Sequence, residues 1–249
     1  MGAEQESVIG GGALSTVEVL DLTVDGHVHT GFAAGRDSVG VVVSAADQAG
    51  LTAITFADQA GPETTWLEAY ADAVRRARPR TEMTLRVAAE VEVVRPDGWL
   101  AMPADLGHLE ALSVAVTRLP LGPDPIGARE VRTRLAAGEI TPEQVAEILV
   151  SATVLGLERA SRYAPTQLAR PLSLLAQVGL DDSVITPDLV DELSRACRQT
   201  GTTVEVSEAW RSPSTRLLAM LRAAQVTLVP ASDARYADEV GRWQYLRRV

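Results

Sequence analysis

The sequence predicts a single α/β domain in which seven strand–helix units form a parallel barrel. Two observations support this prediction. Strand-like apolar segments alternate with segments of helical periodicity along the chain, and such alternation is typical of parallel strands joined by crossovers. In addition, the 249 residues contain no linker or internal repeat that would divide them. An open doubly wound sheet is the alternative, although no glycine-rich phosphate loop follows the first predicted strand.

The first half of the chain contains four predicted strands. Residues 1–15 are predicted to be a flexible leader, and the barrel domain is predicted to occupy residues 16–249. Gly50 and Pro79 mark the ends of two helices, because glycine and proline stop helical periodicity. We expect strands at 24–30, 51–58, 84–94 and 112–117, and helices at 39–50 and 63–78.

The second half of the chain contains three more strands. Three prolines between residues 120 and 125 predict a loop, and a short helix can follow it up to about 137. Thr141, Pro142 and Glu143 are typical of a helix N-terminus and predict a helix over 141–163. We expect strands at 167–171, 202–207 and 226–232, helices at 187–200 and 213–224, and a last helical turn within 238–246.

The composition argues against several classes of protein. The net charge of −10 is the wrong sign for a broad nucleic-acid-binding surface. The single cysteine, Cys197, excludes a disulfide framework. No apolar run approaches the roughly 18 residues of a membrane span, and the first residues lack the pattern of a signal peptide. We therefore expect a cytoplasmic protein without membrane or nucleic-acid partners; its oligomeric state has no signal in the sequence.

The basic residues are 23 arginines, and the chain contains no lysine and no asparagine. This bias is typical of a GC-rich, bacterial genome, and selection against lysine is the alternative. In both cases the protein has no lysine that could form a Schiff base or bind a phosphate.

Polar residues lie at the ends of most predicted strands. In a parallel barrel these ends meet at one edge, where active sites form. His27 and His29 are two residues apart in a strand, so both side chains point to the same side and can bind one cation. Further polar residues at strand ends are Asp58, Gln59, Glu90, Glu92, Arg170, Glu205, Glu208, Asp233 and Arg235. Two histidines with carboxylates suit Zn, Mn or Fe, and two hydrogen-bonded structural histidines are the alternative.

Five segments of the chain resemble motifs of the PHP (polymerase and histidinol phosphatase) family. They are DGHVHT at 25–30, ADQ at 57–59, AAEVE at 88–92, QLARP at 167–171 and SDAR at 232–235, and they follow the order of that family. The resemblance extends over about residues 20–246. It implies a distorted (βα)7 TIM-like barrel of the PHP type, with metal ions at the strand ends and hydrolysis of phosphate esters.

The chain departs from this family where four histidines are expected. Their places are taken by Gln59, Thr117, Arg170 and Arg235. The resemblance implies that the remaining set, His27, His29, Glu90 and Asp233, binds one divalent metal ion. A guanidinium cannot bind a metal, but it can neutralise carboxylates and bind an anion with two hydrogen bonds. Alternatively, the two arginines form salt bridges in an inactive site.

These residues predict a metal-dependent, phosphoesterase-like hydrolase with a mononuclear site. The substrate is expected to be a small phosphorylated or otherwise anionic metabolite. Arg170 and Arg235 would bind the anion, and Asp58 or Glu208 would act as general base. Two alternatives remain: a repurposed enzyme of a biosynthetic pathway (lyase, cyclase or amidohydrolase type), and a catalytically inactive PHP-like binding protein.

Overall fold

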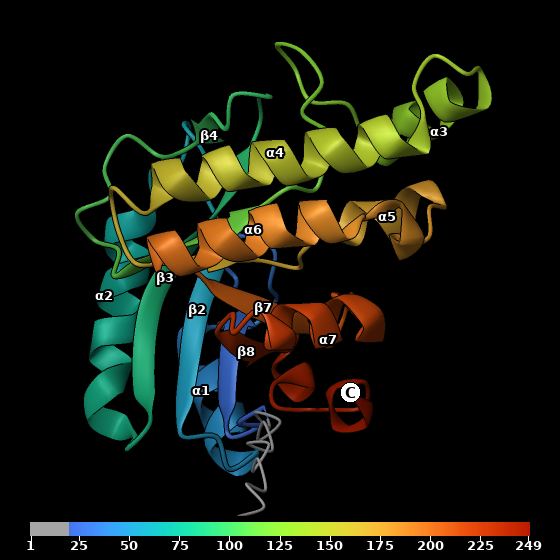
Figure 1. Cartoon of the computed structure of the whole chain (residues 1–249). Helices are drawn as coiled ribbons and strands as arrows, with labels where there is room; N and C mark the ends of the chain where they lie inside the picture. Colours follow the sequence, from blue (N-terminus) through green and yellow to red (C-terminus); the bar gives the residue numbers. More distant parts are fainter. Residues whose placement is uncertain (1–19) are drawn as a thin grey trace, which may run out of the picture.

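Seven parallel strands form the centre of the molecule, for which a computed structural model describes residues 20–249 (Figure 1). The predicted leader at 1–15 and the predicted start of the domain lie outside the described residues. The strands follow the order β1-β2-β3-β5-β6-β7-β8, and neighbours in this order pair in parallel. Their bounds are Val24–Val28 (β1), Ala53–Gln59 (β2), Thr84–Val93 (β3), Ala111–Ala115 (β5), Thr166–Leu168 (β6), Thr203–Ser207 (β7) and Leu228–Ala231 (β8). A short strand, β4 (Leu100–Ala101), pairs antiparallel with β3.

The sheet curves into a nearly closed barrel because β1 meets β8 and the residues that follow it. His29 N donates to Ala234 O (2.9 Å), and Asp233 N donates to His27 O (2.9 Å). Gly26 permits this approach, since a Cβ at that position would lie 2.9 Å from Val229 Cγ2. The predicted seven-stranded barrel is confirmed, and the open doubly wound sheet is not found.

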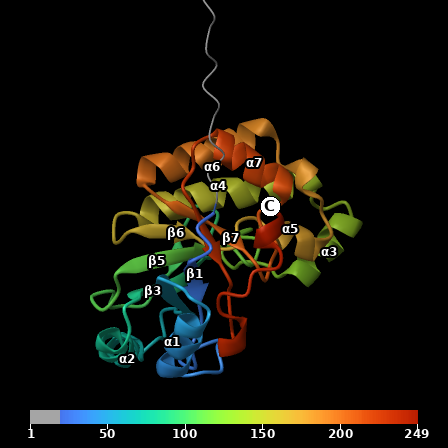
Figure 2. The ribbon, with the colours of Figure 1, turned by 90° about the horizontal axis from the view of Figure 1, so that it is seen from below.

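Helices cover both sides of the strands (Figure 2). Two apolar cores fill the space between helices and strands: one packs α1, α2 and the C-terminal segment, and the other packs mainly α4, α6 and α7. The helices are α1 (Val39–Gln48), α2 (Leu67–Ala77), α3 (Ala128–Ala136), α4 (Pro142–Ala160), α5 (Ser173–Val178), α6 (Pro187–Thr200) and α7 (Thr215–Ala223). None of the helices among residues 20–249 has the length and apolar character needed to cross a bilayer.

The start of α4 follows the predicted chemistry. Thr141 Oγ1 accepts from Gln144 N (3.2 Å), and Gln144 Oε1 accepts from Thr141 N (2.9 Å). Pro142 occupies the first helical position, where its missing N–H costs no hydrogen bond. The reciprocal bonds satisfy two donors that a helix start otherwise leaves without partners.

Several predicted boundaries are wrong. Helix α2 starts at Leu67, not at 63, and the predicted turn at 238–246 is replaced by two 3₁₀ turns at 237–239 and 246–248. Helix α5 was not predicted, because six residues are too few for helical periodicity to be detected. Strand β6 ends at Leu168, not at 171: Arg170 and Leu172 have φ angles of +34° and +59°, which no strand can contain.

The inside of the barrel is lined by small side chains below a polar layer. Ala57, Ala88 and Ala111 lie next to one another in register on β2, β3 and β5 and form a small buried cluster. One step further along the strands, Glu90 is paired with Ser113, and Ser113 with Gln167. The small layer therefore leaves the space above it to polar groups at the carboxyl ends of the strands.

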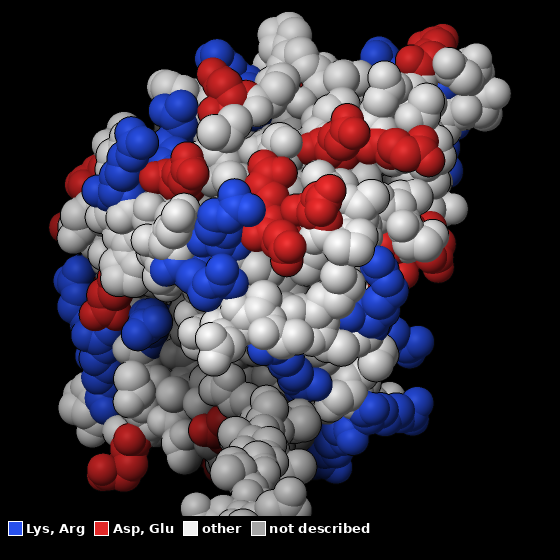
Figure 3. Space-filling view, viewed as in Figure 1, with Lys and Arg blue, Asp and Glu red and all other residues white. Residues whose placement is uncertain are grey.

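The surface charge is unevenly distributed. Figure 3 shows acidic side chains gathered over α4 and α6, and basic side chains near the C-terminus. The net charge of −10 therefore permits locally basic regions.

Candidate metal centre

Seven polar side chains meet inside the mouth of the barrel and form what we call the buried polar cluster. Each is at most 4% exposed, and they come from the carboxyl ends of five strands and the loop after β6. Burial of this many ionisable groups is costly unless they pair with one another or with a metal. The members are His27, His29, Asp58, Glu90, Arg170, Glu205 and Asp233.

His27 is held by a carboxylate on β7. Its Nδ1 lies 2.7 Å from Glu205 Oε1, and its Nε2 lies 3.3 Å from Glu90 Oε2. Glu205 also accepts from Ser113 Oγ (3.1 Å) and from Gln167 Nε2 (2.6 Å). Although burial acts to lower it, the charge and hydrogen bond of Glu205 raise the pKa of His27 to about 10.

His29 lies between two further carboxylates. Its Nε2 is 2.8 Å from Asp233 Oδ1, and its Nδ1 is 3.7 Å from Asp58 Oδ1. Asp58 is positioned by Thr30, whose N donates to Oδ1 (2.9 Å) and whose hydroxyl donates to Oδ2. Burial lowers the pKa of His29, but its bonds to Asp233 and Asp58 outweigh this and raise it.

The loop after β1 fixes the direction of His29. A Cβ on Gly35 would lie 2.7 Å from His29 C and from Thr30 N, so only glycine lets the loop fold back this closely. Gly35 N donates to Thr30 O (2.9 Å). The turn thus holds the backbone that carries both His29 and the Asp58 partner Thr30.

Arg170 supplies a permanent positive charge to the cluster. Its Nη1 donates to Asp233 Oδ2 (3.1 Å), and its Nη2 donates to Glu90 Oε1. Burial acts to raise the pKa of Asp233, but the hydrogen bond with His29 and the charges of His27 and Arg170 hold it well below its usual range. Arg170 and Asp233 both have left-handed backbones, with φ of +34° and +55°. Such strain is concentrated at functional sites in proteins.

Trp210 covers Arg170 from the loop after β7. The guanidinium carbon lies 5.5 Å from the centre of the indole ring, within the range of a cation–π contact. The indole N–H donates to Asp233 Oδ2. Trp210 thereby joins the two strained residues and shields their ion pair from water.

The residues present fit one divalent cation. Within the buried polar cluster, four atoms have no hydrogen-bond partner among the described residues: His27 Nε2, His29 Nδ1, Glu90 Oε2 and Arg170 Nε. A guanidinium cannot bind a metal, but His27, His29 and Glu90 can. One ligand atom from each of these residues lies within 4.8 Å of the others. In both histidines the second ring nitrogen contacts a carboxylate, which is the usual arrangement of a metal-bound histidine. Two nitrogens and one oxygen suit Zn, Mn or Fe.

The structure brings together six of the eight residues that the sequence singles out for the site. His27, His29, Glu90, Asp233, Asp58 and Arg170 all belong to the buried polar cluster. Asp233, however, lies outside the group of three candidate ligands, and its oxygens already contact His29, Arg170 and Trp210.

Arg235 and Glu208 lie apart from the cluster. Arg235 is exposed on the segment after β8. The carboxylate of Glu208 accepts hydrogen bonds from Tyr245 N (2.8 Å) and Leu246 N (3.0 Å) and so holds the C-terminal segment. Both residues line a pocket of about 570 Å³ next to Asp233.

Gln59 and Thr117, at the two other positions where the resemblance implies histidines, stabilise neighbouring carboxylates. Gln59 Nε2 donates to Glu90 Oε1 (3.2 Å), and Thr117 donates to Glu92 through its N (2.8 Å) and hydroxyl. Neither contacts His27 or His29 through a hydrogen bond in the described part of the chain.

Glu205 lies at the end of a predicted strand, but it is not among the predicted site residues. Its signal was available, because a carboxylate between Val204 and Val206 in a buried strand must point into the barrel. Trp210 is not among the site residues that the sequence predicts. No sequence pattern could reveal its contact with Asp233, since that contact joins two loops.

The sequence matches no family model and no curated protein. Among solved structures, an HpcH/HpaI aldolase from Desulfitobacterium hafniense is 14% identical, with 84% of this chain and 86% of that chain covered and a TM-score of 0.39. A protein of Bifidobacterium adolescentis described as a metal-dependent phosphoesterase is 15% identical (86% and 88% covered, TM-score 0.38). A TatD family hydrolase from Entamoeba histolytica is 12% identical (88% and 75% covered, TM-score 0.40). Similarity at this level carries no information about the reaction.

Proposed function

We propose that this protein is a divergent member of the PHP family and acts as a metal-dependent hydrolase with a mononuclear site. Its substrate is a small phosphorylated or otherwise anionic metabolite. One observation carries the proposal: His27 and His29 each bond one nitrogen to a buried carboxylate, and His27, His29 and Glu90 each offer one ligand atom within 4.8 Å of the others. The arginine-rich, lysine-free composition supports a bacterial origin, and a cytoplasmic location is part of the proposal.

His27, His29 and Glu90 would hold the metal. When bound, a divalent ion in such a site polarises the substrate and lowers the pKa of a bound water towards about 7. Glu205 and Asp233 orient the two imidazoles, because each accepts a hydrogen bond from the nitrogen that faces away from the metal position. Zn, Mn and Fe remain the candidate ions.

The other polar residues balance charge, transfer protons or bind the substrate anion. Arg170 is paired with Glu90 and Asp233, so its role is to neutralise these two carboxylates. Asp58 is the carboxylate nearest to the free nitrogen of His29 and is our candidate proton acceptor. Arg235, at the exposed rim, is the residue that would bind the substrate anion. Glu208 has no part in this mechanism.

Elemental analysis of the purified protein, without chelator, tests the proposal. We expect about one Zn, Mn or Fe per chain, and loss of that metal in the Glu90→Gln and His27→Gln variants. His108→Gln is the matched control, because His108 lies outside the cluster and pairs with Asp105 (3.6 Å). The rate at which a panel of phosphate monoesters is hydrolysed should fall at least 100-fold in the two metal-ligand variants and stay unchanged in the control variant.

A catalytically inactive binding protein is the second candidate. The observation that favours it is Arg170, which already neutralises two carboxylates of a cluster that is at most 4% exposed. This candidate predicts that purified protein contains no metal and that Zn or Mn leaves its melting temperature unchanged. A stoichiometric metal would reject it.

A further inference from the structure

The pocket beside Asp233 combines two aromatic side chains with two arginines. It has a volume of about 570 Å³, within the range of pockets that bind small molecules. We call it the mouth pocket. The residues that line it include Trp210, Arg235, Tyr236, Arg242, Glu208 and Glu239. Asp233 lines the same pocket and belongs to the buried polar cluster, so a molecule bound here reaches the edge of the candidate metal centre.

We infer that the mouth pocket binds the substrate and selects molecules in which a planar ring carries an anionic group. The inference rests on the proposed function for the position of the reacting bond, next to Asp233. It adds a substrate class to that function: an aryl or heteroaryl phosphate or carboxylate.

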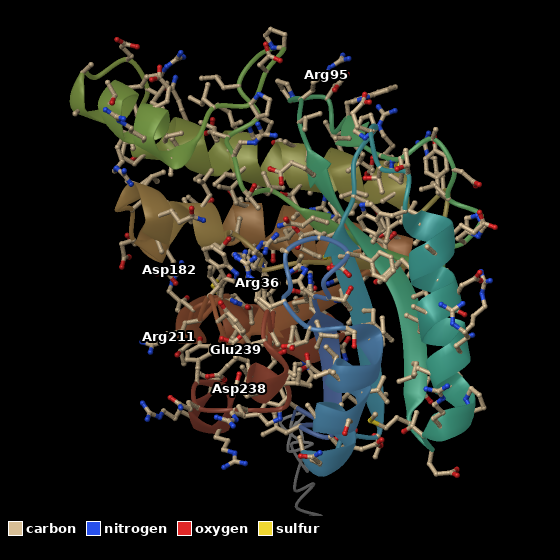
Figure 4. All side chains as sticks on the ribbon, turned by 180° about the vertical axis from the view of Figure 1, so that it is seen from behind. Arg36, Arg95, Asp182, Arg211, Asp238 and Glu239 are labelled. Carbon is tan, nitrogen blue, oxygen red and sulfur yellow. The ribbon has the colours of Figure 1, made fainter. Side chains whose placement is uncertain are left out.

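Two acids of the pocket are bound by backbone amides and not by the guanidiniums of its two arginines. Glu208 is occupied by the amides of Tyr245 and Leu246, and Glu239 Oε2 accepts from Arg235 N (2.8 Å) and Tyr236 N (3.1 Å). Figure 4 shows Glu239 and Asp238 on the segment after β8, close to Arg36, whose N donates to Arg235 O (2.8 Å). The backbone thus stabilises two of the acids and fixes the segment that carries Arg235.

Neither guanidinium of the pocket has an acidic partner. Among the described residues, the arginines with ion pairs are Arg75, Arg78, Arg95, Arg134, Arg170 and Arg216. Arg235 and Arg242 are both exposed and carry two positive charges. Of the lining acids, Asp233 is paired with Arg170, Glu208 and Glu239 accept backbone amides, and Asp238 has no side-chain hydrogen bond in the described region. Two guanidiniums that line one pocket are suited to bind a carboxylate or phosphate group.

The aromatic side chains provide the second part of the selection. The orientation of Trp210 is fixed, since its N–H bonds to Asp233 and its ring lies against Arg170. Tyr236 is 50% exposed and therefore contributes little to the apolar core. A fixed indole and an exposed phenol in one pocket favour a flat ligand, because aromatic pairs gain about 0.5–1.5 kcal/mol beyond their buried area.

Binding of phosphonates tests the inference without turnover, because their C–P bond resists phosphatase chemistry. We would measure phenylphosphonate, methylphosphonate and benzyl alcohol by calorimetry on the purified protein. Phenylphosphonate should bind at least tenfold more tightly than the other two, which each lack one of the two features. Benzoate distinguishes a carboxylate from a phosphate preference.

Variants locate the binding. Arg235→Met and Arg242→Met should each weaken phenylphosphonate about tenfold, as expected for the loss of a charged hydrogen bond. Tyr236→Ala should weaken phenylphosphonate but not methylphosphonate. Arg248→Met is the matched control, because Arg248 is exposed near the C-terminus and does not line the pocket. This variant should bind phenylphosphonate with unchanged affinity.

Two results would overturn the inference. Equal affinities for phenylphosphonate and methylphosphonate would show that the protein does not recognise the ring. Normal binding in both arginine variants would show that the ligand does not bind in the mouth pocket. The same titrations with Glu90→Gln separate this inference from the proposed function. Binding that persists in a metal-free variant without hydrolase activity supports the pocket alone, whereas metal-dependent hydrolysis unaffected by Arg242→Met rejects the pocket alone.

Discussion

Arg170 and Arg235 stand at two positions where the PHP resemblance implies histidines, but their surroundings differ. Arg170 is 3% exposed and bonds to Glu90 and Asp233 under the ring of Trp210. Arg235 is exposed and has no ion pair among the described residues; its backbone N–H, not its guanidinium, contacts Glu239.

The difference shows that burial decides what an arginine contributes to a site. A buried guanidinium must remain paired, because removal from water is repaid only by its partners. Arg170 therefore belongs to the charge balance of the cluster. The guanidinium of Arg235 stays hydrated until a ligand displaces the water, so Arg235 is available to bind an anion.

Replacement of each arginine by methionine should give the largest contrast. Arg170→Met leaves Glu90 and Asp233 buried without their cation, and we expect a loss of about 3–5 kcal/mol in the free energy of unfolding. Arg235→Met should change it by at most about 0.5 kcal/mol. Urea denaturation followed by circular dichroism measures both, and similar losses in the two variants would contradict the comparison.

Addition of metal should sharpen the contrast. If His27, His29 and Glu90 bind Zn, a concentration of 100 times Kd stabilises the folded protein by about 2.7 kcal/mol and raises its melting temperature. The rise should be larger in Arg170→Met, where the ion replaces a lost positive charge, and unchanged in Arg235→Met. His27→Gln should abolish the rise; if the rise persists there, the assignment of the ligands is wrong.

A smaller effect is expected from the indole that covers Arg170. Trp210→Phe retains a ring but loses the N–H bond to Asp233, so we expect a loss of about 1–2 kcal/mol in the free energy of unfolding. Trp99→Phe is the control, since Trp99 is 49% exposed and also stacks on an arginine, with Arg159 at 5.1 Å. Equal losses in the two variants would mean that the bond to Asp233 contributes nothing.

The last effect concerns Cys197, a buried residue of α6 that influences stability only at alkaline pH. Burial raises the pKa of its thiol from an ordinary value near 9 to about 12. Between these values the unfolded chain loses the proton and the folded protein keeps it, so stability falls as the pH rises. In Cys197→Ala the decline should be shallower by about 1.4 kcal/mol per pH unit at most.

The same thiol can compare the two arginine variants. At pH 8, alkylation of Cys197 requires unfolding, and its rate should increase strongly in Arg170→Met and little in Arg235→Met. Rapid labelling of the wild-type protein would show that Cys197 is not buried in solution.

The strand order and most of the cluster could be predicted from the sequence, because both follow from local patterns. Alternating apolar segments define the strands, and His27 and His29 share a face through the two-residue period of a strand. The left-handed backbone at Arg170 could not be predicted, since it depends on contacts with Glu90 and Asp233 on other strands. The strand predicted through Arg170 was therefore too long.

The two arginines also show why the rest of the site required a structure. Arg170 and Arg235 look alike in the sequence, since each directly follows an alanine near the end of a predicted strand. Their difference in exposure arises because Arg170 turns inward at a positive φ, while Arg235 continues onto the surface segment. Similarly, Glu208 was predicted as a base, and only the fold shows that its carboxylate holds the amides of Tyr245 and Leu246.

Closure of the barrel between its first and last strands has a consequence for synthesis of the chain. His29 and Asp233, which contact each other at 2.8 Å, are 204 residues apart. A ribosome therefore releases both histidines of the candidate centre long before their partners on β7 and β8 exist. The centre can assemble only after residue 233 has emerged, and until then the edge of β1 is exposed to wrong pairings.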